Sequence, residues 1–355
     1  MPLSRALPVL VEPALTPRES LARDRFLLQA VVASPERWPA ALRVFDLAGE
    51  AVSIGRWQLA PEPAATSIAL MRRHSGGRAA AFGTGFVGVS LILLARGALL
   101  EPGTPPLRPE QVMNRYVRGI LGGLERRRIP ALYPGRDTIT ARRRQLGVVS
   151  FAETSAGAVL VETIVATSGD PSALPRLLDR ADPGGVVRAA MLTPADTTSI
   201  AAEQGGAPTL EELADWMAAG YAERLGATPE ARTLDDTETA RIGEIASEID
   251  DGTWVASRRP RDDLDRRASA ATMLGVLEVH LAVGADARIR DACISGDLIA
   301  ADETIPALEQ ALRGCRPDRA AVAAAVARVL AEPHQFLLGV GPADTLVDTV
   351  MQALG

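Results

Sequence analysis

The stretch between Met71 and Ser90 constrains the fold of this chain more than any other part of the sequence. Two arginines run into a Ser-Gly-Gly turn, and small residues with two more glycines lead from it into an apolar, strand-like segment. Gly76 and Gly77 allow the backbone to take positive φ and to approach another group closely. Such a bend can turn several backbone N–H groups toward an anion, and the arginines add charged, fork-shaped donors. Because a tight hairpin turn has the same composition, the surrounding segments must decide between the two.

Length and composition indicate a protein of two domains with an ordinary hydrophobic core. The chain has 355 residues, of which 47% are hydrophobic and 23% charged, and a chain of this length normally forms two domains. Its longest apolar stretches, such as 86–95, have the length of a strand and are too short to span a membrane. The first ten residues lack the continuous apolar region of a signal peptide. Since only two cysteines occur, without metal-ligand spacing, we expect a reduced, cytoplasmic protein.

The charged residues exclude one class of partner and have one unusual feature. The net charge of −6 argues against general nucleic-acid binding, which needs a strongly basic face. The sequence contains no lysine, so that all 38 of its basic residues are arginine, although lysine is normally common. A GC-rich genome would explain this through its codons. Selection against reactive amines would also explain it, in an enzyme that releases a reactive acyl group.

Periodicity and turn residues predict alternating strands and helices over the first 250 residues. Residues 1–17, which contain four prolines, are predicted to form an extended arm, with Ser20 capping the helix that follows. A short helix over 64–70 is predicted to lead into the glycine-rich turn. The other predicted helices cover 21–32, 110–127, 209–221 and 237–250, and the predicted strands cover 42–45, 51–54, 86–94, 147–151 and 158–167.

The sequence changes character near residue 255. Residues 257–263 are charged and polar and are typical of a linker. Beyond them, two alternating strands at 275–283 and 288–297 precede helices at 304–312 and 319–330, and a last helix begins at 343. We therefore predict an α/β (α+β) protein with two domains. Residues 1–255 would form a large domain with a mixed or mostly antiparallel sheet and flanking helices, and residues 256–355 a small α/β domain.

Two motifs in this order of segments resemble a known family. Arg72-Arg73-His74-Ser75-Gly76-Gly77 is similar to the Arg-Arg-x-Ser-Gly-Gly-Gly loop of the lipoate–protein ligases. Ile54-Gly55-Arg56-Trp57-Gln58 resembles their Ile-Gly-Arg-x-Gln turn. The resemblance, within the wider biotin and lipoate protein ligase superfamily, runs from about residue 18 to the C-terminus. The strand–strand–helix–helix order after residue 275 resembles the family's small accessory domain.

The resemblance implies a two-step reaction and a set of site residues. In the family, lipoate and ATP, with Mg²⁺, give lipoyl-AMP, and the lipoyl group then passes to a lysine of a lipoyl carrier domain. Such chemistry needs fixed positive charge and backbone donors around two anions, and a pocket that excludes water. The positions that the resemblance assigns to acid and adenylate are Arg72, Arg73, Ser75, Gly76, Gly77, Arg78, Phe82 and Gly147. Arg56 and Trp57 would border the lipoyl pocket, although core packing explains Trp57 equally well, and Asp137 matches the Asp of an Asn-Asp pair in which Arg136 replaces the Asn.

The sequence departs from the family where the chemistry takes place. The family's Lys-x-x-Gly run ends here at Gly147, which puts Arg144 in the position of the catalytic lysine. An arginine keeps the charge and can bridge two oxyanions, but its planar fork differs from an ammonium point charge. A His-Asp pair of the family is replaced by Phe82-Gly83. A His-His-Gly-Thr stretch falls at Leu160-Val161-Glu162-Thr163, with a register uncertain by one residue.

Other catalytic arrangements find less support in the sequence. Cys293 and Cys315 both fall in the small domain, so the cysteine nucleophile of a thioester-forming octanoyltransferase is missing from the large one. His74, His280 and His334 are not spaced as metal ligands, and we expect no metal held by the protein itself. A Ser-His-Asp hydrolase would need a nucleophile-elbow motif, which the sequence lacks.

Three functions fit these observations. In the first, the protein is a lipoate-type ligase in which Arg144 acts in place of the lysine; the intact Arg-Arg-x-Ser-Gly-Gly loop favours it. In the second, it is a catalytically degenerate relative that binds a lipoyl carrier domain or a free acid; Phe82 and the apolar Leu160-Val161 favour this one. The third keeps adenylate chemistry but uses a different acid or acceptor.

Overall fold

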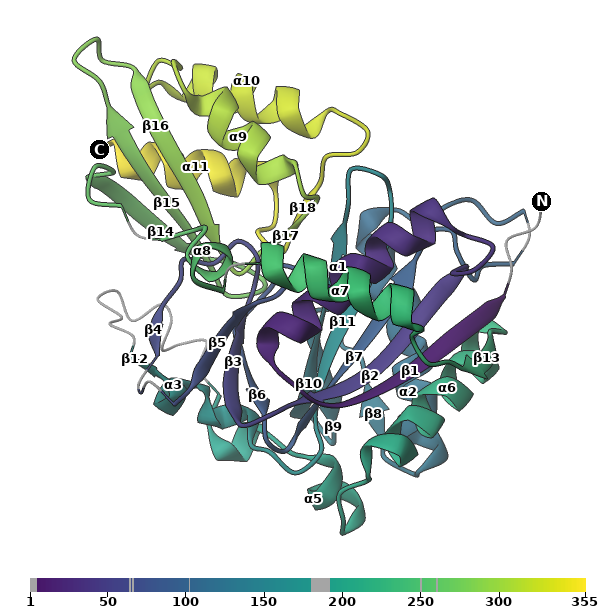
Figure 1. The fold of residues 1–355 in the computed structure, drawn as a ribbon. Coiled ribbons are helices and arrows are strands. Elements are labelled where there is room, and N and C mark those ends of the chain that lie inside the picture. The colour runs from purple at the N-terminus through teal and green to yellow at the C-terminus, as the bar shows by residue number, and fades with distance from the viewer. Residues whose placement is uncertain are drawn as a thin grey trace.

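The structure, a computed structural model, describes residues 5–63, 65, 67–101, 103–179, 192–249, 251–259 and 261–355. Figure 1 shows that the described chain forms a large sheet with helices on both faces and a smaller layered part above it. The strands of the large sheet all precede residue 232, and those of the smaller part's main sheet all follow residue 265. The predicted division at residue 255 stays a prediction, but the two sheets fall on either side of it.

The large sheet is mixed, as the sequence predicts. Its strand order is β13-β1-β2-β7-β11-β10-β9-β8. β1 pairs in parallel with both β13 and β2, and the other neighbours are antiparallel. The strands are β1 (Ala6–Leu15), β2 (Ala40–Leu47), β7 (Phe86–Leu93), β8 (Ala131–Leu132), β9 (Thr138–Ala141), β10 (Arg144–Glu153), β11 (Val159–Ala166) and β13 (Thr228–Ala231).

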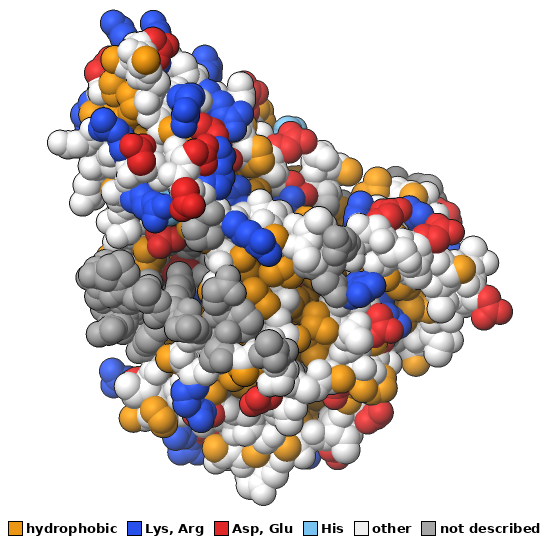
Figure 2. Space-filling model, turned by 60° about the vertical axis from the view of Figure 1, so that its left-hand side comes forward, with side chains coloured by type: hydrophobic (Ala, Val, Ile, Leu, Met, Phe, Trp, Pro, Cys, Tyr) orange, Lys and Arg blue, Asp and Glu red, His pale blue; other side chains and the backbone are white. Residues whose placement is uncertain are grey.

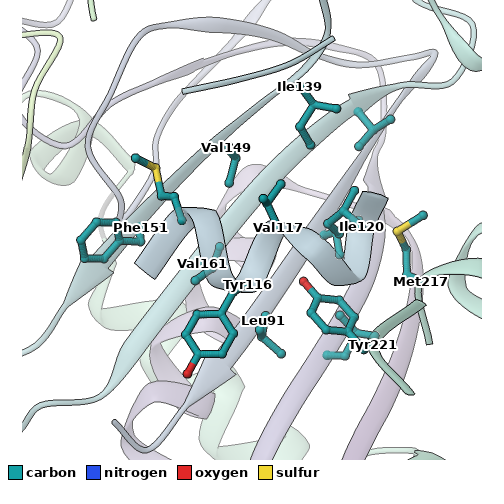
Figure 3. Packing of buried hydrophobic residues seen from close by; sticks show 14 of the residues in the cluster. Leu91, Tyr116, Val117, Ile120, Ile139, Val149, Phe151, Val161, Met217 and Tyr221 are labelled. Carbon is teal, nitrogen blue, oxygen red and sulfur yellow. The ribbon is translucent and has the colours of Figure 1, made fainter. Parts of the chain in front are cut away.

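Helices α2 (Pro109–Arg126) and α6 (Leu210–Leu225) cover one face of this sheet. Figure 3 shows side chains of α2, such as Tyr116 and Ile120, packed over buried residues of the strands, such as Leu91 and Val149. The two helices lie very close together, because an added Cβ on Gly220 would lie 2.1 Å from the carbonyl oxygen of Gly119. A core of aliphatic and aromatic side chains therefore fixes this face.

Helices α1 (Pro17–Ala33) and α7 (Asp236–Glu248) pack on the opposite face. Beside α1 lies a three-stranded sheet of order β5-β3-β6, made of β3 (Glu50–Ile54), β5 (Ala69–Arg72) and β6 (Ala80–Gly83). Short elements complete this side: β4 (Glu62–Pro63), η1 (Pro171–Ala173), α3 (Leu174–Leu177), β12 (Leu178–Asp179), η2 (Pro194–Asp196) and α5 (Ile200–Gln204). The glycine-rich turn joins β5 to β6, so it lies on this side of the large sheet.

The C-terminal part (residues 256–355) has the predicted order of two strands and two helices. After α8 (Asp251–Val255), its sheet runs β14-β15-β16. Its elements are β14 (Arg266–Ala271), β15 (Val276–Val283), β16 (Ile289–Gly296), β17 (Ile299–Ala300), α9 (Thr304–Leu312), α10 (Arg319–Leu330), β18 (Leu337–Leu338) and α11 (Ala343–Leu354). On the face that Figure 2 shows, arginine and acidic side chains are interspersed over this upper lobe.

Three predictions about local structure were wrong. Residues 6–15 form β1 of the large sheet instead of an arm, with residues 1–4 outside the described part. The following helix begins at Pro17, because Thr16 and Glu19 form a capping box, whereas Ser20 is buried within the helix. The helix predicted over 64–70 is not formed where the structure describes it: Ala64 and Thr66 lie outside the described residues, and Ala69–Arg72 is β5.

Within the described ranges, every helix is too short or too polar to cross a lipid bilayer.

Candidate functional site

The glycine-rich turn is packed against the C-terminal part of the chain. A Cβ on Gly76 would lie 2.1 Å from the carbonyl oxygen of Leu298, and Gly77, with φ of +83°, donates its N–H to the same oxygen at 2.8 Å. The N–H of Ser75 donates to a carboxylate oxygen of Glu162 at 2.7 Å. The glycines therefore permit a close approach, as predicted, but the group that approaches is the backbone of residues 298–299.

The paired arginines hold the loops around the turn. Arg72 is buried and donates to the carbonyl oxygens of Gly55, Arg56, Gln58, Val255 and Arg258, at 2.6–3.2 Å. Arg73 is also buried and donates to the Ser75 hydroxyl at 3.1 Å and to the carbonyl oxygens of Ser53 and Arg78 at 3.2 and 2.8 Å. Burial lowers the pKa of both guanidinium groups, to about 10 for Arg72. A pKa of about 10 leaves Arg72 charged at neutral pH, and both guanidinium groups organise the backbone of these loops.

Arg78 forms the ion pair closest to the turn. Its Nε and Nη2 donate to the two carboxylate oxygens of Asp137, each at 2.8 Å. Asp137 is 2% exposed, so the pair is largely shielded from water. Although burial opposes it, the carboxylate of Asp137 raises the pKa of Arg78. Two of the five N–H groups of Arg78 are thus committed to Asp137.

An apolar cavity of about 90 Å³ lies next to Arg78 (the outer cavity). Its walls come from the turn and β6, from β10 and β11, and from the segment around α3. Its apolar lining consists of Ala79, Ala80, Ala81, Phe86, Leu146, Gly147, Val148, Ile164, Ala166, Pro171, Leu174, Pro175, Leu178 and Leu192. The polar groups that line it are Gln58, Arg78, Gln145, Ser172 and Asp297. This composition is typical of a site for a mostly apolar molecule with one polar end.

A second cavity of about 20 Å³ (the inner cavity) continues along the same face of the sheet. It is lined by Phe45, Ser53, Met71, Arg73, Phe82, Ser90, Val148, Ser150, Glu162, Thr163 and Ile164. Burial raises the pKa of the Glu162 carboxyl to about 7, and the nearby Asp24 adds to that effect. The predicted residues Arg78 and Gly147 thus line the outer cavity, and Arg73 and Phe82 line the inner one.

Solved structures similar to this chain include LipL1 of P. falciparum, in complex with lipoate. It is 14% identical, with a TM-score of 0.74, over 98% of this chain and 100% of that one. A lipoate protein ligase of Thermoplasma acidophilum, from a study with its E2 lipoyl domain, is 17% identical, with a TM-score of 0.58, over 73% and 99%. Lipoate-protein ligase A bound with ATP is 17% identical, with a TM-score of 0.56, over 71% and 98%. The chain has the lipoate–protein ligase fold.

No protein-family model and no curated protein matches this chain. The similar solved structures confirm the resemblance of its motifs to the lipoate–protein ligases at the level of the fold.

Arg144 lies at the start of β10, outside both cavities. Its Nη2 donates to Glu203 of α5 at 2.7 Å, and Arg142 donates to the other oxygen of the same carboxylate at 3.0 Å. The Thr198 hydroxyl donates to Glu203 at 2.7 Å. Glu203 is thus held by three donors, and its carboxylate pairs with the guanidinium of Arg144. The catalytic role of Arg144 stays a prediction.

Arg56 and Trp57 lie between the two parts of the chain. Trp57 is 4% exposed and packs with Leu277 and Leu298 in the hydrophobic core of the C-terminal part. The guanidinium of Arg56 lies 5.2 Å from the centre of the Trp57 ring and 3.2 Å from a carboxylate oxygen of Asp302. Neither lines the outer or the inner cavity, so in this structure their contacts join the large sheet's loops to the C-terminal part.

Four polar residues of the outer cavity were not predicted as site residues: Gln58, Gln145, Ser172 and Asp297. Gln58 donates to Asp297 at 2.7 Å and accepts the N–H of Gly55 at 2.8 Å. Asp297 also accepts the N–H of Val276 at 3.0 Å. Gln58 stands in the Ile-Gly-Arg-x-Gln motif, which could have indicated it. Asp297 comes from a strand end more than 200 residues away, and no local pattern marks it.

The residues at the site do not fit a magnesium ion bound by the protein. Both oxygens of Asp137, the predicted acidic residue, already accept hydrogen bonds from Arg78. Among the residues that the structure describes, no group of three His, Cys, Asp or Glu side chains could hold a metal.

Proposed function

We propose that this protein is a lipoate-type ligase that takes lipoate or a similar medium-chain acid. The acid would bind in the outer cavity with its carboxylate toward Arg78, and ATP would enter as its magnesium complex. The observation that carries the proposal is the apolar cavity beside Arg78, on a fold shared with proteins whose structures contain lipoate or ATP. A lipoyl carrier protein would be the acceptor, since one structure of this fold comes from a study of a ligase with its lipoyl domain.

The proposed reaction has two steps. A carboxylate oxygen of the acid attacks the α-phosphorus of ATP, which forms the acyl-AMP anhydride and releases pyrophosphate. The amine of a carrier lysine then attacks the acyl carbon, loses a proton, and displaces AMP. The partly buried guanidinium of Arg78 would orient the carboxylate through N–H groups not used by Asp137, and the apolar walls would keep water from the anhydride. We place the enzyme in the cytoplasm because both cysteines are free thiols.

Arg144 enters this proposal only if it leaves Glu203. Freed from that carboxylate, its guanidinium would supply the positive charge that the α-phosphate needs as pyrophosphate departs. The pair in the structure favours a second candidate function, in which the protein binds the acid or a lipoyl carrier domain without ligation. The two functions predict different results for the same variants.

The test is calorimetric titration with lipoic acid, octanoic acid and ATP, followed by mass analysis for acyl-AMP. A ligase would form acyl-AMP in the native protein and lose it in Arg144→Ala, with acid binding retained. Arg143→Ala, which removes the same charge one residue away, is the matched control and should keep the activity. Arg78→Gln should weaken acid binding itself.

Two results would contradict the ligase proposal. Acid binding without acyl-AMP, in the native protein and in Glu203→Gln alike, would establish the binding function instead. Absence of binding to all three ligands would refute the ligase function and the binding of a free acid.

A further inference from the structure

The inner cavity contains an unusual concentration of buried hydroxyl groups. Ser53, Ser90 and Ser150 are between 1% and 4% exposed, and all three line this cavity. Their hydroxyl oxygens have no hydrogen-bond partner among the residues that the structure describes. A buried polar group left without a partner costs about 1–3 kcal/mol, and native proteins contain few of them. Three around one cavity indicate a place built for a polar occupant.

The volume of the inner cavity matches a single small group. A cavity needs roughly 10–15 Å³ to hold one water-sized group, and this one offers about 20 Å³. The three hydroxyls belong to three different strands, β3, β7 and β10, so they surround the space instead of lining one side. A hydroxyl placed there could donate to one serine and accept from another.

The inner cavity adjoins the outer one, and Val148 and Ile164 line both. On β10, Leu146 and Val148 line the outer cavity, and Val148 and Ser150, which point to the same face of the sheet, line the inner one. Val148 pairs with Ile164, which also lines both cavities, and Ser150 pairs with Glu162. Ser150 and Glu162 of the inner cavity therefore lie two residues along these strands, about 7 Å, from Val148 and Ile164, which line both cavities.

The charges around the inner cavity favour a neutral occupant. The guanidinium of Arg73 lines it but already donates to the Ser75 hydroxyl and to the carbonyl oxygens of Ser53 and Arg78. Glu162 is the acidic group that lines it, and it would repel a second carboxylate. A hydroxyl or similar neutral group does not need the charge of Arg73 and is not repelled by Glu162.

We propose that the acid taken by this protein carries a neutral hydrogen-bonding group, such as a hydroxyl, which enters the inner cavity and bonds to Ser53, Ser90 and Ser150. The inference rests on the proposed function, and it narrows the substrate class from apolar medium-chain acids to acids with such a group along or at the end of the chain. An apolar acid whose chain filled the inner cavity would leave the three hydroxyls unpaired, and a site of that kind discriminates against it.

The experiment compares acids of equal size by calorimetric titration of the full chain. The probes are terminally hydroxylated straight-chain acids from hexanoic to decanoic, each matched with the unsubstituted acid one carbon longer. At the length that fits, the hydroxy acid should bind about tenfold more tightly, the worth of one or two hydrogen bonds. The corresponding dicarboxylic acids should gain nothing.

The variants identify the groups responsible. Ser90→Ala combined with Ser150→Ala should abolish the tenfold preference and leave binding of the unsubstituted acids unchanged or tighter. Ser155→Ala, at an exposed serine, should keep the preference. Because the double substitution removes unpaired hydroxyls, its urea unfolding midpoint should equal or exceed that of the native protein, which shows that it folds.

The possible outcomes separate this inference from the proposed function. If unsubstituted acids bind as well as hydroxy acids at every length, the inference is overturned while acid binding stands. If the preference survives in the double variant, the serines are not its cause and the inference is equally wrong. If no acid binds, the proposed function fails and the inference fails with it.

Discussion

Arg72 gives the clearest test of whether the paired arginines serve structure or ligand binding. Its side chain is buried and donates to five backbone carbonyl oxygens in two separate segments, residues 55–58 and 255–258. Arg72→Met keeps much of the apolar stem and removes every donor. Carbonyl groups that are buried and lose their partner then carry their full desolvation cost.

The size of the effect follows from these contacts. Hydrogen bonds to a charged group contribute about 1.5–3 kcal/mol each, but burying the guanidinium costs several kcal/mol and the freed loops can relax toward water. We expect Arg72→Met to lower the free energy of unfolding by about 3–5 kcal/mol, less than the sum over five carbonyl groups because the burial cost of the guanidinium is removed with it. Arg72→Lys keeps the charge but offers three donors without the planar fork, and should lose about half as much.

Urea unfolding, followed by circular dichroism, measures this prediction. Arg143→Met makes the same change at an exposed position and should stay within about 0.5 kcal/mol of the native protein. A loss below about 1 kcal/mol in Arg72→Met, together with weakened ATP or acid binding, would refute the structural reasoning and restore the ligand role that the sequence motif implies.

Two further predictions concern the turn and the buried carboxyl behind it. Gly76→Ala should lower the free energy of unfolding, measured by urea titration, by about 2–4 kcal/mol, because its Cβ would lie 2.1 Å from the Leu298 carbonyl oxygen. Gly206→Ala is the control: the added Cβ has open space around it, so this variant should be neutral or slightly stabilising. The raised pKa of Glu162, about 7, means that its carboxyl ionises at lower pH in the unfolded state than in the folded state. The free energy of unfolding should therefore fall as pH rises from about 4.5 to 7. In Glu162→Gln this part of the decline should disappear from unfolding curves recorded across that range, and an unchanged pH profile would disprove the assignment.

The sequence predicted elements where one local signal dominates. The last three helices have strong apolar periodicity and clear boundaries, and α9 (Thr304–Leu312) and α10 (Arg319–Leu330) begin and end at the predicted residues. The N-terminal strand β1 was missed because its prolines suggested an irregular segment. Its pairing partners lie at residues 42–47 and 228–231, so its structure depends on contacts that no local window contains.

The difference between local signals and long-range contacts also explains which features of the site could be predicted. The glycines of the turn were correctly interpreted as positions of close approach, since the absence of a side chain is visible in the sequence. What approaches them, the backbone of Leu298, could not be predicted, because it depends on how the C-terminal part packs against the turn. The inner cavity was missed for a related reason: Ser53, Ser90 and Ser150 lie in ordinary strand sequences and converge only through the pairing of the sheets.

The C-terminal part contributes directly to the outer cavity, and this has a thermodynamic consequence. Asp297 lines the cavity beside Arg78, and the adjacent Leu298 accepts the N–H of Gly77. A ligand that contacts Asp297 favours the positions of the C-terminal part in which that contact is made. If binding of that ligand changes the affinity of the C-terminal part for a partner protein, the partner must change the affinity for the ligand by the same factor. An acceptor protein could thus regulate loading of the cavity from a distance, without touching the ligand.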